Sequence, residues 1–123
     1  MSQNTLMEYF GHLLIKAGRD KTIANFDKLL QSGKDDKVMG GKYKPMLDTL
    51  DDMQMVQLRS LAIWLVDTTL HNVMFMFEET DNIRISVEHN NVEIKDIRKA
   101  SDGLHGDIYS WAEEYSKEPL SNV

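Results

Sequence analysis

The feature that most constrains the fold is a stretch of 27 residues, 53–79, that contains neither glycine nor proline. As one helix rising ~1.5 Å per residue, it would be about 40 Å long. Its large apolar side chains gather on one face of a helical wheel, and most polar ones lie opposite. The apolar face consists of Leu58, Leu65, Val66, Leu70, Val73, Met74, Met76 and Phe77. The pattern predicts a central core helix, buried over more than half of its circumference.

Capping signals divide the residues before this stretch into short helices. Thr5 and Glu8 have the spacing of a capping box, and Gly18 suits the C-cap of the helix that follows. Asp20 would then cap a second helix. Pro45 suits the first turn of a third. We therefore expect short helices at the N-terminus, with a glycine- and lysine-rich connection over residues 33–44.

The pattern changes after residue 80. Apolar and polar side chains alternate over residues 83–87, the period of a half-buried strand. Residues 89–91, His-Asn-Asn, suit a chain reversal because asparagine tolerates positive φ, and residues 92–97 would form the partner strand. A two-stranded hairpin is only marginally stable alone. It must therefore pack on the helices, and a third strand or a dimer partner would complete the sheet.

These segments predict an α+β fold that is mostly helical: a helical bundle around one long central helix, with a C-terminal β-hairpin and a short final helix. We expect one domain over residues 1–123. Its predicted parts are short helices over 1–50, the long helix over 52–80, the hairpin over 83–97 and the last helix over 104–118.

Composition excludes several classes of function. The chain contains no cysteine, so it has no disulfide framework or thiolate zinc site. The first residues lack the basic and apolar regions of a signal peptide, and no uninterrupted apolar run approaches the ~20 residues that span a bilayer. We expect a cytoplasmic protein that binds neither membrane nor nucleic acid and needs no cofactor.

The charge is unevenly distributed, and this favours a basic partner. Residues 1–61 hold nine Lys and Arg against eight Asp and Glu, a net charge of +1. Residues 62–123 hold five against twelve, a net charge of −7, so the chain carries −6. An acidic surface repels phosphates and attracts basic proteins. The same charge could equally serve only to keep the domain soluble.

Three side chains on the long helix could form part of a metal site. Asp67, His71 and Glu78 are four and seven residues apart, which places them on one helix face. Imidazole and carboxylate are suitable ligands for zinc, manganese or iron. Further ligands would have to come from His12, His105, Asp102 or Asp107, and no spacing singles one out. The alternative is that these three residues are only the solvated face of an amphipathic helix.

A chemically dense loop, residues 101–106 (Ser-Asp-Gly-Leu-His-Gly), precedes the last helix. It matches neither a nucleophile elbow nor a dinucleotide-binding motif. Helix capping by Asp102 or Asp107 explains its composition.

Aromatic side chains offer a different kind of site. Trp64 and Phe75 lie three turns apart on the edge of the polar stripe, and exposed aromatics at such positions mark contact sites, including self-association. Together with carboxylates of the acidic half they form the predicted partner-binding set. That set is Trp64, Glu78, Glu79, Asp81, Glu88, Glu93, Asp96 and Trp111.

Two resemblances bear on function. Residues 67–79 and 101–107 look like small bacterial proteins that pair a long helix with a hairpin and a short final helix. The short, acidic, cysteine-free chain also resembles bacterial toxin-immunity proteins in type, which would imply a tight one-to-one complex with a cognate toxin. We therefore expect a non-catalytic binding module that neutralises a basic toxin domain. The alternative is a small metal-binding protein or hydrolase that uses Asp67, His71 and Glu78.

Overall fold

The computed structural model describes residues 3–32 and 40–120. The predicted class, α+β and mostly helical, with a long helix, a hairpin and a short final helix, is confirmed. The elements in chain order are α1 (Gln3–Leu13), η1 (Leu14–Asp20), α2 (Lys21–Ser32), α3 (Gly40–Leu47), α4 (Asp52–Glu79), β1 (Val87–His89), β2 (Val92–Ile94), η2 (Ile97–Ala100) and α5 (Leu104–Tyr115). Residues 33–39 of the predicted connection lie outside the described part.

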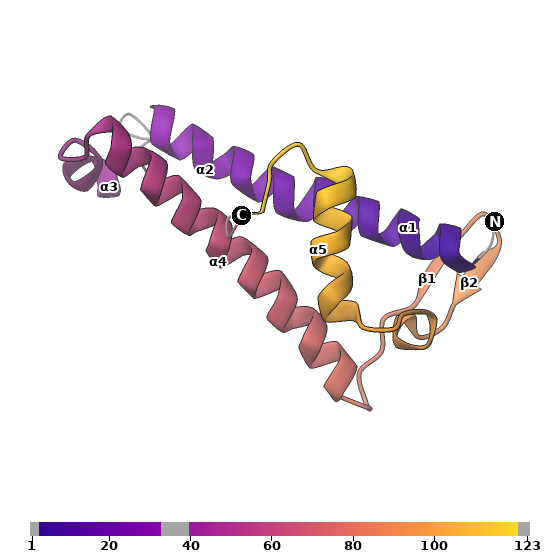
Figure 1. The fold of residues 1–123 in the computed structure, drawn as a ribbon. Coiled ribbons are helices and arrows are strands. Elements are labelled where there is room, and N and C mark those ends of the chain that lie inside the picture. Colours follow the sequence, from indigo (N-terminus) through magenta and orange to yellow (C-terminus); the bar gives the residue numbers. More distant parts are fainter. Residues whose placement is uncertain (1–2, 33–39, 121–123) are drawn as a thin grey trace.

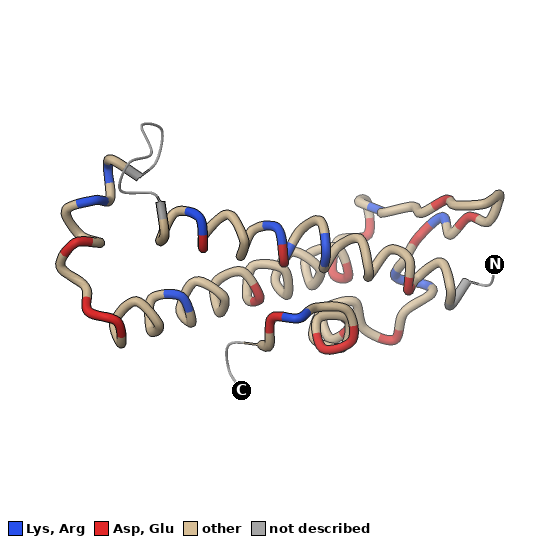
Figure 2. Tube along the Cα trace, turned by 90° about the horizontal axis from the view of Figure 1, so that it is seen from above, with Lys and Arg blue, Asp and Glu red and all other residues tan. Residues whose placement is uncertain are grey.

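Two long helical rods dominate the molecule. Figure 1 shows α1 and α2 running as one rod, while α4 starts beside α2 and diverges from this rod toward its own C-terminal end, and the hairpin lies beside the N-terminal part of α1. Seen from above in Figure 2, α5 lies across one side of this helix pair and is viewed nearly along its axis. The pair therefore has one side covered by α5 and one side that α5 leaves open.

The predicted break between the first two helices is wrong. The helix passes through the junction because η1 is π-helical, and its flanking residues Leu13 and Lys21 keep helical φ and ψ. Gly18 lies within η1 instead of ending a helix, and its carbonyl accepts a hydrogen bond from the Thr22 hydroxyl at 2.8 Å. The Asp20 carboxylate accepts from the Ser116 hydroxyl instead of capping a helix.

Two other predicted helix starts are also displaced. Because α1 begins at Gln3, Thr5 lies inside the helix and not at its cap. Pro45 lies inside α3, which begins at Gly40. A proline in so short a helix interrupts little hydrogen bonding, since only a few backbone bonds exist to be lost.

The extent of α4 agrees with the long helix predicted over residues 52–80, but its burial does not. Asp51 forms a capping box: the Gln54 amide donates to its carboxylate at 2.8 Å, and its own amide donates to the Gln54 side chain at 2.9 Å. The helix then runs unbroken to Glu79. However, its buried residues are Ile63, Asp67 and Met74, so the helix is not buried over most of its circumference.

The core lies between α1, α5 and the hairpin. Trp111 of α5 packs directly on the α1 backbone, because a Cβ added at Gly11 would lie only 2.5 Å from the indole ring. Phe10 meets the same ring edge-on, at 5.8 Å between centroids. The buried cluster contains Leu6, Met7, Ile15, Met74, Ile94, Ile97, Leu104, Ile108, Trp111 and Ala112.

The hairpin is shorter than predicted but turns at the predicted residues. Asn90 and Asn91 have φ values of 51° and 65°, the two positive values that a tight two-residue turn requires. Pairing covers only Val87–His89 and Val92–Ile94. Ile97 belongs to η2 instead of the second strand, although its amide donates to the Ile85 carbonyl at 3.0 Å. Stacking of Tyr9 on His89, with 4.1 Å between ring centroids, holds the turn end against α1.

By length and composition, α4 could cross a membrane, which the sequence reading did not anticipate because it counted only uninterrupted apolar runs. The core helix of a soluble protein passes the same test. In this structure, however, only 17% of the most apolar window of α4 is buried. Several large apolar side chains of α4 are therefore exposed, while Leu70 and Phe77 are partly buried against the core cluster.

Gly11→Ala is expected to destabilise the fold by about 1–3 kcal/mol, because the added methyl group would overlap the buried Trp111 ring. The matched control is Gly106→Ala in α5, where an added Cβ meets nothing within 4 Å. Helix propensity should make that variant neutral or slightly more stable. Urea unfolding of both variants checks the packing, and equal stability of the two would contradict it.

Candidate interaction surface

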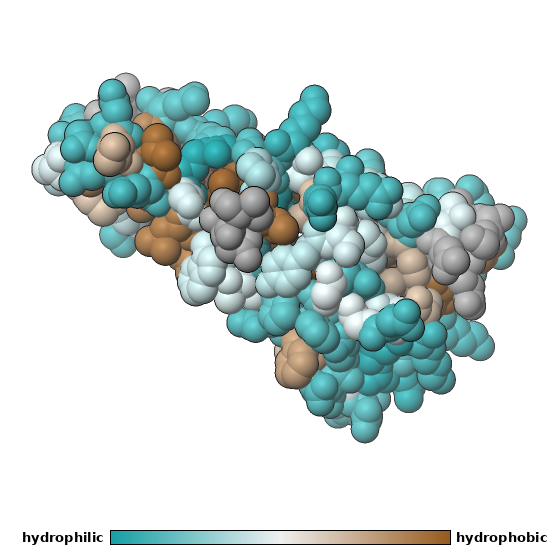
Figure 3. Space-filling view, in the orientation of Figure 1, coloured by the Kyte–Doolittle hydropathy of each residue, from teal (hydrophilic) through white to brown (hydrophobic). Residues whose placement is uncertain are grey.

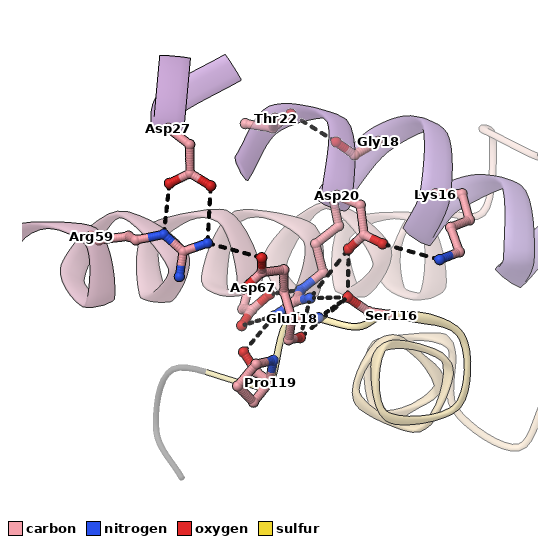
Figure 4. A network of polar contacts seen from close by, with 11 residues as sticks. Lys16, Gly18, Asp20, Thr22, Asp27, Arg59, Asp67, Ser116, Glu118 and Pro119 are labelled. Carbon is pink, nitrogen blue, oxygen red and sulfur yellow. Dashed lines mark hydrogen bonds and ion pairs between the residues drawn. The ribbon is translucent and has the colours of Figure 1, made fainter. Parts of the chain in front are cut away.

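A buried ion pair fixes how α4 faces the rest of the molecule. The Arg19 side chain is fully buried, and its Nε donates to Asp67 Oδ1 at 2.5 Å while Nη2 donates to Oδ2 at 3.3 Å. The remaining donors reach Ser116 Oγ at 2.9 Å and the carbonyl oxygens of Glu118 and Pro119 at 2.8 and 3.1 Å. All five guanidinium N–H groups thus have an acceptor. Figure 4 shows how η1, α4 and the segment after α5 meet there.

This ion pair removes Asp67 from the predicted metal site. Its carboxylate faces Arg19, and no group of three His, Cys, Asp or Glu side chains able to hold a metal ion occurs within residues 3–32 and 40–120. Sequence analysis missed Arg19. A signal did exist, because Arg19 is four residues from Ile15 and four from Ile23, both of which are buried.

Glu78 is also engaged inside the molecule. It accepts hydrogen bonds from the His105 amide at 2.7 Å and lies 2.8 Å from the ring Nδ1 of the same residue. Burial acts to raise the pKa of Glu78, but the hydrogen bonds and charge of His105 outweigh it and lower that pKa below its ordinary value. A carboxylate at the first turn of α5 also suits the helix dipole. Glu78 is thus a cap for α5.

His71 lies beside this cap without joining it. Its ring is 5.2 Å from the His105 ring and 5.6 Å from the Tyr109 ring, between centroids. Its Nδ1 is buried and has no hydrogen-bond partner within the described residues. The structure therefore brings His71 near Glu78 through His105, while Asp67 serves a separate contact.

The loop before α5 is held by its own side chains. The Ser101 hydroxyl donates to Asp107, and the Gly103 amide donates to the Ser101 hydroxyl at 3.0 Å. The N-cap residue is Gly103, which has no side chain, so neither Asp102 nor Asp107 caps the helix as predicted. His12, the other candidate ligand, meets the Tyr115 ring edge-on at 5.3 Å.

The predicted acidic contacts fall into two groups. Asp96 is 5% exposed and binds Arg98 at 2.8 Å, which lowers the pKa of Asp96 below its usual value against the opposing effect of burial. It is therefore part of the fold. The exposed carboxylates are Glu79, Asp81, Glu88 and Glu93, with Asp81 also near Arg98. Glu88 and Glu93 lie directly opposite each other on the hairpin, a like-charge pairing that costs stability.

The two tryptophans are in opposite situations. Trp111 is 8% exposed and packs against Gly11, so it contributes to the core and not to a surface. Trp64 on α4 is 47% exposed, and Phe75 on the same helix is 45% exposed. The Phe75 ring meets His105 edge-on at 5.5 Å, which places this edge of α4 on the side of the molecule that carries α5.

The outward side of α4 carries no charge and is rich in large apolar side chains, with polar uncharged residues such as Gln57, Ser60 and Asn72 among them. Between residues 53 and 77 the only charged side chains are Arg59 and Asp67, and both are paired with other elements: Arg59 with Asp27 at 2.6 Å, Asp67 with Arg19. Eight large apolar side chains of α4 are exposed: Met53, Val56, Leu61, Trp64, Leu65, Val73, Phe75 and Met76. Figure 3 shows brown side chains gathered over the N-terminal part of α4. A patch of this kind on a folded chain marks a contact surface.

The Arg19–Asp67 pair makes a testable prediction about stability. Asp67→Asn would remove the closest counter-charge of the buried guanidinium and leave only Asp20, whose carboxylate lies 3.6 Å from Arg19 Nη1, so we expect it to lower the free energy of unfolding by about 3 kcal/mol. Asp27→Asn breaks a similar pair with Arg59 in which both side chains are about one-third exposed. That control should cost about 1 kcal/mol or less. Equal losses in urea unfolding at neutral pH would show that the buried pair has no special role.

The Glu78 cap predicts a pH dependence. Since the pKa of Glu78 is lowered in the folded state, its stabilisation is present above the ordinary carboxyl pKa and is lost as the pH falls through the lowered value. Glu78→Gln should therefore lower stability by about 1 kcal/mol near neutral pH, and this difference from the wild type should shrink in acid. The exposed neighbour provides the control, Glu79→Gln. A difference that stays constant as thermal unfolding is repeated at lower pH would refute the role of the carboxylate.

No protein-family model, curated protein or solved structure matches this chain.

Proposed function

We propose that this chain is a non-catalytic binding module that docks a protein partner on α4. The observation that carries the proposal is the uncharged outward side of this helix, with eight exposed large apolar side chains, while its two charged side chains, Arg59 and Asp67, are paired with other elements. Burying such a surface in a complex removes apolar area from water without desolvating a charge. Most surface helices of a monomer carry charged residues on this side instead.

The anchor of the proposed site is an aromatic patch, formed by Trp64 and Phe75. Tryptophan is enriched among the residues that dominate binding energy, particularly where it is surrounded by groups that exclude water. The two rings lie eleven residues apart, which is about 16 Å along one side of a helix. The Phe75 ring is already held against His105, so little side-chain freedom would be lost on binding.

Carboxylates at the C-terminal end of α4 favour a basic partner. Glu79 and Asp81 follow Phe75 closely in the chain and are exposed, and Asp102 is exposed in the loop that packs beside them. Negative charge at the rim of an apolar patch increases the association rate of a basic partner and discriminates against acidic ones. In its sharper form, the proposal is that the partner is a basic toxin domain that this chain neutralises, as the resemblance in type to immunity proteins implies.

The alternative, a metal-binding protein or hydrolase, has less support. Two of its three residues, Asp67 and Glu78, are engaged by Arg19 and by His105. A metal ion would have to displace a buried guanidinium from the first of them, which would leave that charge unpaired.

Affinity capture with variants tests the proposal. The wild-type chain should retain one partner stoichiometrically from its own cell lysate, while Trp64→Ala should lose it by at least about tenfold in affinity, a difference of 1.4 kcal/mol or more. Met46→Ala is the matched control, since Met46 on α3 is exposed to 48%. Higher salt should slow association. Retention of the same partner by Trp64→Ala would contradict the proposal.

A further inference from the structure

We propose that residues 116–120, the segment after α5, form a releasable strap that closes over the middle of α4 and covers Ile63. Ile63 is next in the chain to Trp64, so release of the strap would extend the aromatic patch by a side chain that is now buried. The strap thereby controls how much of α4 a partner meets. This control rests on the proposed function, whereas the closing of the strap is a property of the chain alone.

The strap begins where α5 cannot continue. Ser116, the C-cap residue, has extended φ and ψ values of −97° and 146°, and its amide donates to the Ala112 carbonyl at 3.0 Å. Pro119 then disfavours helical geometry at the residue before it. Within the described part of the chain, no backbone–backbone hydrogen bond joins residues 117–120 to another segment. The strap is therefore held by side chains of other elements.

Two arginines from different elements hold the strap. Arg19 of η1 donates to the carbonyl oxygens of Glu118 and Pro119 at 2.8 and 3.1 Å. It also donates to Ser116 Oγ at 2.9 Å. Arg59 of α4 pairs with the Glu118 carboxylate at 2.9 Å. The strap thus ties η1 to α4 through charged side chains, at a level where the two helical rods diverge (Figure 1).

Ile63 lies between the two points where the strap is held. Arg59, Ile63 and Asp67 are spaced four residues apart, so their side chains form one line along α4. Glu118 binds Arg59 at one end of this line, and its carbonyl binds the same guanidinium that pairs with Asp67 at the other. Figure 4 shows Glu118 beside this stretch of α4. Ile63 is only 6% exposed, although it is not a member of the main buried cluster.

The contacts of the strap can be broken without unfolding the chain. The side chains of Arg59 and Glu118 are 32% and 34% exposed, and ion pairs with such exposure contribute little stability. Leu120 adds a partly buried apolar contact. Arg19 would exchange the acceptors in the strap for water while it keeps its pair with Asp67. Segments held mainly by exposed polar contacts open at a low free energy compared with the core.

The helix that faces the strap has an unusual backbone at this point. η1 is π-helical over Leu14–Asp20, and π-helical turns are rare and occur frequently at functional sites. Asp20 accepts a hydrogen bond from the Ser116 hydroxyl at 2.5 Å, and Arg19 donates to the same oxygen. Consecutive residues of the π-helical turn thus both bind the first residue of the strap. This placement favours a specific closed state over a loosely attached chain segment.

Thiol labelling of the full chain tests the strap. The chain contains no cysteine, so Ile63→Cys reports opening of the strap through its rate of labelling. Adding Glu118→Arg, which places two positive charges together at Arg59, should raise this rate by at least about tenfold, and Glu118→Gln by about threefold. Glu113→Arg makes the same change of charge at an exposed position of α5 and should have no effect. Met74→Cys, which is 4% exposed in the main buried cluster, reports unfolding and should label at an unchanged rate.

A second measurement avoids the cysteine probe. The Nε proton of Arg19 is bound to Asp67, and the whole side chain is buried while the strap is closed. Its exchange with water, followed by NMR in the chain without cysteine, should also be faster by about tenfold in Glu118→Arg. This readout keeps the test valid if Ile63→Cys does not fold.

Three results would overturn the proposal. The first is a Glu118→Arg chain that is folded by circular dichroism and leaves the labelling of Ile63→Cys or the exchange of the Arg19 proton unchanged. The second is equal acceleration at Met74→Cys, which would mean that the whole chain unfolds. The third is equal acceleration by Glu113→Arg. No partner takes part in these measurements, so their failure can be told apart from a failure of the proposed binding.

Discussion

The buried pair of Arg19 and Asp67 is the constraint on which the rest of the structure depends. A guanidinium without solvent contact requires a counter-charge and an acceptor for every N–H group, and only one rotation of α4 about its axis supplies Asp67. That rotation turns Ile63 and Met74 inward with Asp67 and turns Leu65 and neighbouring apolar residues outward. The exposed apolar side of α4 therefore follows from a polar contact in the interior.

The sequence predicted the elements well where a residue type restricts the backbone conformation. The stretch without glycine or proline forms the long helix, and Asn90 with Asn91 adopts the positive φ values that a tight turn needs. The prediction that Gly18 ends a helix is wrong, since the helix continues through this residue as a π-helical stretch. A glycine permits a helix to end but does not require it to end there, so Gly18 alone was a weak signal.

The orientation of α4 could not be predicted from hydrophobic periodicity. The wheel placed Asp67 on the solvated face and Leu65 and Met76 on the buried face, which is the reverse of the structure. Periodicity assumes that apolar residues point inward, and α4 breaks this assumption because the buried pair of Arg19 and Asp67 sets its rotation. Likewise, Trp64 and Trp111 look alike in the sequence, and only the space at Gly11 shows which one is buried.

The most direct test of this account measures which side of α4 faces solvent. Because the chain has no cysteine, single substitutions Leu65→Cys and Met74→Cys can be compared by their rates of thiol labelling. The account predicts that Leu65→Cys reacts at nearly the rate of an unfolded chain and that Met74→Cys is protected, since the exposed fractions are 52% and 4%. Protection of Leu65→Cys with rapid labelling of Met74→Cys would contradict it.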